Sequence, residues 1–145
     1  MSQVSVLLVE DSEEDAYLAM RVLRQQGVAG ESIVWLQDGE EALHYLTEEQ
    51  EARKRLASLR LILMDLKMPK LSGLEVLQRI RQDYSLHQLP VVIWSSSAEV
   101  QDIQASYALG SNSYLVKPMG YQEFSDAVSS LSSYWLKHNC LPQIS

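Results

Sequence analysis

Residues 61–69 of the 145-residue chain read LILMDLKMP, and this stretch decides the fold. Four consecutive large apolar residues, Leu61 to Met64, are typical of a strand buried on both faces of a parallel sheet. Asp65 follows at once, where the carboxyl end of such a strand meets solvent. Ligands bind at this edge of an open α/β sheet, so Asp65 is the first candidate functional residue.

Similar apolar runs recur along the chain between segments with helical periodicity. The five predicted strands are Val4–Val9, Ser32–Leu36, Leu59–Met64, Val91–Ser95 and Ser113–Val116. Strands that alternate with helices indicate an α/β fold, a parallel sheet with helices on both faces. No repeat or linker marks a boundary, so residues 1–145 are expected to form a single domain.

Helix boundaries are indicated by a few local motifs. Two Ser-x-x-Glu motifs, Ser72 with Glu75 and Ser96 with Glu99, predict capping boxes at the starts of two helices. Gly27 stands where a helix C-terminal glycine is expected. The charged stretch 47–60 reads as a solvated helical extension, with favourable pairs between positions 49 and 53 and between 51 and 55.

The composition excludes several classes of function. A formal net charge of −7 and a pI near 4.9 repel nucleic acid and anionic membranes, so we expect neither as a partner. The single cysteine, Cys140, rules out an internal disulfide and a cysteine-built metal site. The longest apolar runs have strand length, and no basic segment followed by a long apolar one opens the chain, so we expect a cytoplasmic protein.

Polar residues follow four of the five predicted strands. Glu10 and Asp11 follow the first and Asp65 the third. Each alone has a plainer reading, as a helix N-terminal charge or a turn residue. Three carboxylates on one rim, however, repel each other unless a cation lies between them, and oxygen ligands of this kind suit Mg²⁺. The sequence therefore predicts a Mg²⁺ site at this edge.

The other two strands add groups that suit a phosphoryl ligand. Ser95 ends the fourth strand and Lys117, with Pro118 after it, follows the fifth. Alone, they would read as a cap and as a loop lysine in solvent. Together they offer a hydrogen-bond donor and a positive charge, which is what phosphoryl oxygens need. Asp65, central in strand order, is the candidate phosphoryl acceptor.

These motifs resemble the receiver domains of two-component response regulators. The resemblance is carried by LVED at 8–11, LILMDLKMP at 61–69 with Gly73 after it, Ser95, and YLVKP at 114–118. It covers about residues 3–137 and leaves a short tail at 138–145. The Glu-Asp pair, the charged segment before Leu61 and the tail make it closest to the stand-alone regulators that partner bacterial and cyanobacterial phytochromes.

The resemblance implies a flavodoxin-like (βα)5 receiver fold with strand order 2-1-3-4-5, and a role for each site residue. Asp65 would be phosphorylated, Asp11 would bind Mg²⁺ directly, and Glu10 would act on the metal through water. The remaining roles fall to the backbone carbonyl of Lys67 on the metal, Ser95 and Lys117 on the phosphoryl oxygens, Tyr114 as the switch aromatic, and Pro118, often cis in the family.

The resemblance also implies the partners. A histidine kinase, with a phytochrome as the candidate, would supply the phosphoryl group, and output would pass by protein contact, with a further phosphotransfer protein as a candidate target. Such a protein catalyses only its own Mg²⁺-dependent phosphorylation and dephosphorylation, and it is not a turnover enzyme. Two rivals stay open: a flavodoxin-like or phosphatase-like enzyme on the same sheet order, and a pseudo-receiver that acts only as a scaffold.

The last helix predicts a homodimer. Its main apolar stripe comprises Phe124, Ala127, Val128, Leu131 and Trp135. Other apolar groups, namely Tyr121, Tyr134 and Leu136, with Leu141, Pro142 and Ile144 in the tail, lie outside that stripe. Exposed apolar patches often mark protein contacts, so we expect pairing through this helix and the tail.

Overall fold

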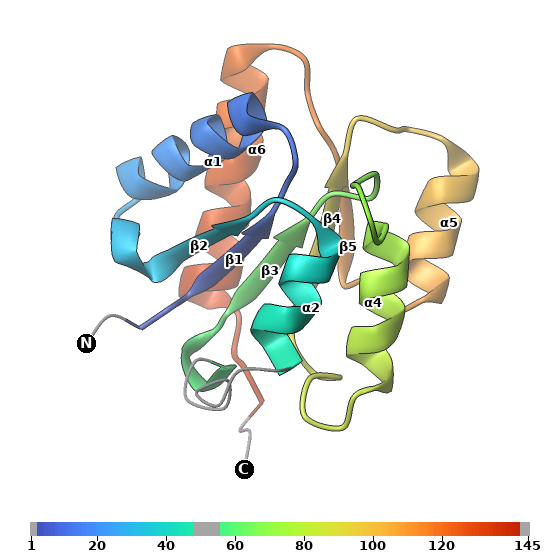
Figure 1. Ribbon diagram of the computed structural model, residues 1–145. Coiled ribbons are helices and arrows are strands. Elements are labelled where there is room, and N and C mark those ends of the chain that lie inside the picture. Colours follow the sequence, from blue (N-terminus) through green and yellow to red (C-terminus); the bar gives the residue numbers. More distant parts are fainter. Residues whose placement is uncertain (1–2, 48–55, 143–145) are drawn as a thin grey trace.

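The computed structural model describes residues 3–47 and 56–142, and its centre is a five-stranded parallel sheet (Figure 1). The strands are β1 (Val6–Val9), β2 (Ile33–Leu36), β3 (Leu61–Met64), β4 (Val91–Ser95) and β5 (Ser113–Val116). Their order is β2-β1-β3-β4-β5, which confirms the predicted topology. Three strands begin one or two residues later than predicted. Residues 4–5 and 59–60 precede β1 and β3 in irregular backbone, and Ser32 ends a short 3₁₀ helix, η1 (Gly30–Ser32).

Helices cover both faces of the sheet, as the alternation of elements predicts (Figure 1). The described helices are α1 (Glu13–Gln25), α2 (Gly39–Thr47), α4 (Gly73–Gln82), α5 (Val100–Ala108) and α6 (Tyr121–Ser132). One core cluster joins α1 and α6 to one face, and the other joins α2 and α4 to the opposite face. Among the described residues, no helix is long and apolar enough to cross a membrane.

The two core clusters follow from the alternation of side chains along each strand. Leu7, Ile62 and Ile93 point to the α2 and α4 side. Leu8 and Trp94 point to the α1 and α6 side. Trp94 is 1% exposed and its ring centroid lies 5.4 Å from that of Phe124. This bulky residue is therefore part of the core.

One predicted capping box is present and the other is wrong. Ser72 and Glu75 cap α4 reciprocally. Glu99 is instead the N-cap of α5, without a side-chain bond. The hydroxyl of Ser97 instead ties the loop to the start of α5, because it accepts from the Glu99 N–H at 3.2 Å and donates to Asp102 at 2.5 Å.

Gly27 adopts the left-handed conformation expected at a helix C-terminus, with φ of 97°. Of the charged stretch 47–60, positions 48–55 lie outside the described residues, and so do both predicted ion pairs. Residues 56–58 are helical, and Leu56 is buried in the core beside α2.

The chain continues beyond α6 in a wider π-helical turn, η2 (Ser133–His138). This turn brings Leu136 as well as Trp135 against the core, so the expectation that Leu136 is exposed is wrong. Tyr121 and Tyr134 are exposed as expected, at 56% and 52%. The tail then runs along the amino ends of the strands, where the Arg60 guanidinium donates to the Asn139 carbonyl at 2.7 Å.

Candidate functional site

Three carboxylates meet at the carboxyl edge of the sheet. Oxygens of Glu10, Asp11 and Asp65 lie within 4.8 Å of one another. Glu10 is fully buried, Asp65 is 8% exposed and Asp11 is exposed. The cluster therefore has a buried floor and one side open to solvent.

The pairing of β1 with β3 creates this cluster. Val9 lies beside Met64 in register, so the next residues, Glu10 and Asp65, emerge side by side. The Asp65 N–H donates to the Val9 carbonyl at 3.0 Å and extends the ladder by one bond. Behind Asp65, Gly73 opens α4 so close to the Asp65 carbonyl that a Cβ at this position would overlap it. The acceptor candidate is thus fixed from both sides.

Lys117 reaches into the cluster from the end of β5. Its ammonium nitrogen lies 2.6 Å from Oε1 of Glu10 and 3.2 Å from Oδ2 of Asp65. The side chain is only 9% exposed, and the nitrogen lies 4.9 Å from the centroid of the Trp94 ring. A positive charge is therefore held directly against the candidate phosphoryl acceptor.

Burial and mutual contact shift two pKa values. Burial raises the pKa of Glu10 to about 7, with a further contribution from Asp65, against the opposing effect of Lys117. Burial alone would lower the pKa of Lys117, but its carboxylate partners, Glu10 foremost, outweigh this and raise it. Lys117 is therefore an ammonium at neutral pH, whereas Glu10 lies between its protonated and ionised forms there.

The residues present fit a divalent cation. The buried Oε1 of Glu10 has an ion-pair partner in Lys117 but no hydrogen bond of acceptable geometry. Around it stand two more carboxylates, one of them open to solvent. Hard oxygen ligands of this type suit Mg²⁺ or a similar ion, and a cation there would relieve the repulsion among them.

Ser95 and Tyr114 are linked through the loop after β4. Ser95 is buried, and its Oγ accepts from the Ser97 N–H at 3.1 Å. The Tyr114 hydroxyl donates to the Ser97 carbonyl at 2.8 Å. Sequence reasoning missed Ser97, because nothing in an exposed serine-rich loop marks which hydroxyl turns inward.

One further residue named from the sequence, Lys67, lies beside the acceptor. Lys67 is exposed, and its N–H lies 3.4 Å from Oδ1 of Asp65. The backbone of this loop thus runs close to the acceptor carboxylate. The peptide bond before Pro118 is trans, which corrects the cis geometry suggested by the family resemblance.

Asp15 is a fourth acid at the site, and sequence reasoning missed it. Its Oδ2 accepts from the Lys117 ammonium at 2.9 Å. Asp15 lies in the first turn of α1, where its N–H donates to the Ser12 hydroxyl at 3.3 Å. The only sequence signal is the spacing of a capping serine and an acid three residues later, which is a common helix start.

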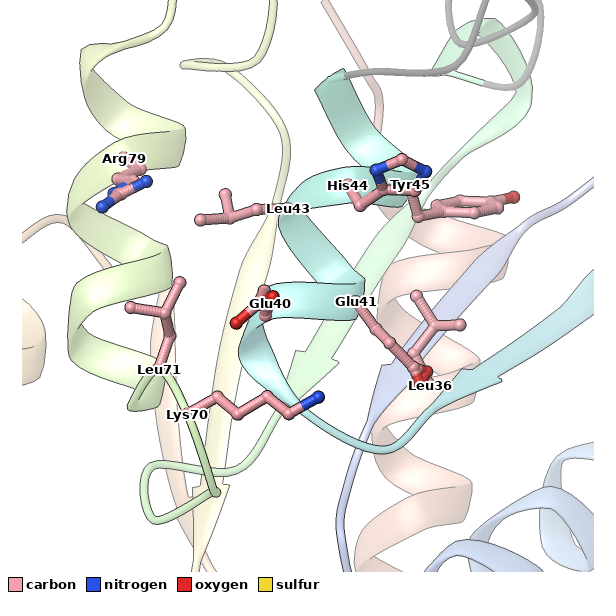
Figure 2. A pocket seen from close by; sticks show the side chains of 9 residues that line it. All are labelled: Leu36, Glu40, Glu41, Leu43, His44, Tyr45, Lys70, Leu71 and Arg79. Atoms are coloured by element: carbon pink, nitrogen blue, oxygen red, sulfur yellow. The ribbon is translucent and has the colours of Figure 1, made fainter.

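A separate groove lies between α2 and α4, with a cavity volume of about 450 Å³ (Figure 2). Glu40 and Glu41 line it from α2, and Arg79 and Leu71 line it on the α4 side (Figure 2). Lys70 reaches across its end, 3.6 Å from Asp38. None of the predicted site residues lines the groove, which offers charges of both signs and no single ligand chemistry.

Comparison with known proteins identifies the family. The family model for the response regulator receiver domain matches residues 6–129. The chain belongs to this family and is a receiver domain of two-component signalling, whose general partner is a histidine kinase.

Two relatives match along most of their length. Response regulator Rcp1 of Synechocystis sp. is 37% identical over 94% of this chain and 92% of its own. The probable methanogenesis regulatory protein FilR2 of Methanothrix harundinacea is also 37% identical, over 94% of this chain and 86% of its own.

Solved structures agree with these relatives. The Mn²⁺-bound form of Rcp1 superposes with a TM-score of 0.86 at 35% identity and covers 97% of this chain and 99% of its own. The phosphorylated cyanobacterial phytochrome response regulator RcpA gives a TM-score of 0.87 at 34% identity and covers 98% of this chain and 100% of its own. The chain is therefore similar to the phytochrome response regulators within the family.

Proposed function

We propose that the protein accepts a phosphoryl group on Asp65 from a histidine kinase, with Mg²⁺ bound at the acidic edge. The observation that carries this proposal is the contact of Lys117 with Asp65, at 3.2 Å, beside the carboxylates of Glu10 and Asp11. An acceptor oxygen, a metal-binding cluster and a fixed positive charge are the parts that phosphoryl transfer needs.

The chemistry assigns a role to each residue. The N–P bond of a kinase phosphohistidine breaks and an O–P bond forms to Asp65. Bound Mg²⁺ would neutralise charge on the transferred group, held by Asp11 and Asp65, by Glu10 through water, and by the Lys67 carbonyl. Lys117 and the Ser95 hydroxyl donate to the phosphoryl oxygens.

The output of the switch passes through Tyr114. When Ser95 turns toward the phosphoryl group, its bond from the Ser97 N–H, now 3.1 Å, is disturbed. The Ser97 carbonyl also accepts the hydrogen bond from the Tyr114 hydroxyl. A shift of Ser97 would therefore release Tyr114 to turn inward. The surface formed by α5, β5 and α6 then changes, and binding partners respond to that change.

The partners follow from the relatives. A phytochrome is the proposed kinase, because the phytochrome response regulator RcpA is 34% identical to this chain and covers 98% of it. A downstream phosphotransfer protein is a further candidate. The protein is not a turnover enzyme in this proposal, and we place it in the cytoplasm, where histidine kinases expose their donor sites.

The rival enzymes are disfavoured by the first strand end. A flavodoxin-like protein needs a phosphate-binding loop after its first strand. Here Glu10 occupies that position, fully buried beside Asp65, and would repel a phosphate. A scaffold without phosphorylation is disfavoured because acceptor, acids, hydroxyl and lysine are all present at one edge.

The experiment for this proposal is intact-mass spectrometry after incubation with acetyl phosphate, with and without Mg²⁺. One phosphoryl adduct is expected in wild type with Mg²⁺ and none in Asp65→Asn. Asp83→Asn, a carboxylate removed at the far end of α4, is the matched control and should behave as wild type. An adduct of unchanged yield in Asp65→Asn would refute the assignment.

A homodimer through α6 and the tail is the second part of the proposal. Tyr121 and Tyr134 supply exposed aromatic surface on this side of the molecule. Leu141 and Pro142 line a groove with Leu56 and Leu89, so the described part of the tail forms one wall of a groove beside the core. In the proposed dimer, the tail would contribute by shaping the surface through which the two copies pair.

Light scattering over a concentration series tests the dimer. The full chain should show a concentration-dependent dimer. The dimer of a chain ending at Lys137 should have a larger dissociation constant. A monomer throughout, or a dimer indifferent to the truncation, contradicts this part of the proposal and leaves the role of Asp65 untouched.

A further inference from the structure

The ammonium of Lys117 has three carboxylate neighbours. In the proposed reaction two of them change their bonding and can no longer hold the ammonium in the same way. An ammonium carries three N–H donors. Its neighbours are Glu10 at 2.6 Å, Asp15 at 2.9 Å and Asp65 at 3.2 Å. Asp65 becomes an acyl phosphate in the proposed reaction, and Glu10 belongs to the carboxylate cluster that fits a cation. Of the three, only Asp15 remains a free carboxylate bound to the Lys117 ammonium during phosphoryl transfer.

Asp15 is itself held in place by secondary structure. It lies in the first turn of α1, a helix of 13 residues whose N-cap is Ser12. The Asp15 N–H donates to the Ser12 hydroxyl, and α1 packs through Ala16 and Ala19 into the core. The Asp15 carboxylate therefore projects from a rigid helix, whereas the Lys117 ammonium lies at the end of a flexible side chain of four methylene groups.

We infer that Asp15 is a positioning residue that holds the Lys117 ammonium beside the phosphoryl-accepting oxygen of Asp65. This inference rests on the proposed function of Asp65. Asp15 touches neither the reacting oxygen nor the cluster that would hold the cation, and it acts through Lys117. By binding one N–H of the ammonium, Asp15 keeps another directed at Asp65 when Glu10 serves the metal.

A competing effect of opposite sign has to be separated. Asp15 also adds a negative charge near the place where an anionic phosphodonor arrives, and its removal would speed that approach. Glu14 provides the matched control, because it is exposed in the same helical turn and carries the same charge. Glu14→Gln therefore reports the general charge effect without the contact to Lys117.

The test measures phosphorylation kinetics of the full chain with acetyl phosphate at saturating Mg²⁺. A partly buried charge-assisted hydrogen bond supports a loss of about tenfold in the maximal rate for Asp15→Asn and Asp15→Ala. Asp15→Glu should recover part of the rate. The donor concentration for half-maximal rate and the Mg²⁺ affinity should change by less than about twofold, because neither the donor nor the cation contacts Asp15.

A double-mutant cycle distinguishes positioning from a general structural effect. In a Lys117→Met background, Asp15→Asn should change the residual rate no further, because the contact it removes is already gone. An equal slowing in both backgrounds would overturn the inference, and so would a rate in Asp15→Asn equal to or above that of Glu14→Gln.

The same measurements separate the inference from the proposed function. A wild-type protein that takes no phosphoryl group on Asp65 overturns both. A wild-type protein that is phosphorylated normally on Asp65, with a normal rate in Asp15→Asn, overturns the role of Asp15 alone.

Discussion

The stability of the metal-free protein should depend on pH through Glu10. Burial raises the pKa of this carboxyl from its ordinary 4.5 to about 7 in the folded protein. The folded state therefore holds the proton more tightly than the unfolded state does. The stabilising contribution is complete below pH 4.5 and is lost as pH rises through 7.

The size of the effect follows from the two pKa values. A tenfold change in a proton dissociation constant is worth about 1.4 kcal/mol. The free energy of unfolding should thus fall by about 2 to 3 kcal/mol between pH 5 and pH 8 on account of Glu10 alone. Lys117 adds no slope in this interval, because its raised pKa leaves it charged in both states.

Urea titrations followed by tryptophan fluorescence, with a chelator present, measure this slope at pH 5, 6, 7 and 8. Glu10→Gln keeps the shape of the side chain and an oxygen for the Ser12 N–H, which donates to Glu10 at 3.0 Å. The difference in slope between wild type and Glu10→Gln isolates the carboxyl. Saturating Mg²⁺ should flatten the wild-type slope, because a cation favours the ionised form. Identical slopes in the two proteins would refute the reasoning.

Three further changes give distinct expectations. Asp11→Ala removes the exposed acid of the cluster and should raise the Mg²⁺ dissociation constant about tenfold or more in a fluorescence titration; an unchanged constant would argue for another site. Arg81→Met removes hydrogen bonds to four oxygens in the loops before β4 and β5, and should lower the free energy of unfolding by about 2 kcal/mol in urea; a stability equal to wild type would contradict this. Gly73→Ala places a Cβ against the Asp65 carbonyl and should cost about 2 kcal/mol of stability and slow phosphorylation, whereas Gly30→Ala, where the nearest atom is 3.7 Å away, should do neither.

The positions of the main site residues could be predicted from the sequence because they follow buried strands. A run such as Leu61 to Met64 fixes where a strand ends, and the parallel order brings those ends to one edge. Glu10, Asp11 and Asp65 meet there for that reason. Their roles in the reaction stay predictions until the experiments above are done.

The residues that sequence reasoning missed depend on orientations that periodicity does not encode. Asp15 reaches Lys117 only because of the direction in which α1 leaves β1. Ser97, and not Ser96, bonds to the start of α5, because the loop turns its hydroxyl toward Asp102. Leu136 packs inward because the last helix widens into a π turn. No local sequence pattern predicts this turn.

The central claim is that residue 65 carries the phosphoryl group, and chemical mapping of the phosphorylated chain tests it most directly. Borohydride reduces an acyl phosphate to an alcohol, so an aspartyl phosphate becomes homoserine in the peptide that contains it. The protein should be treated with acetyl phosphate and Mg²⁺, reduced, digested and sequenced by mass spectrometry. Homoserine at position 65 and at no other aspartate is the expected result. Homoserine at position 11 or 15, or none in a protein that carries the phosphoryl adduct, would contradict the assignment of Asp65.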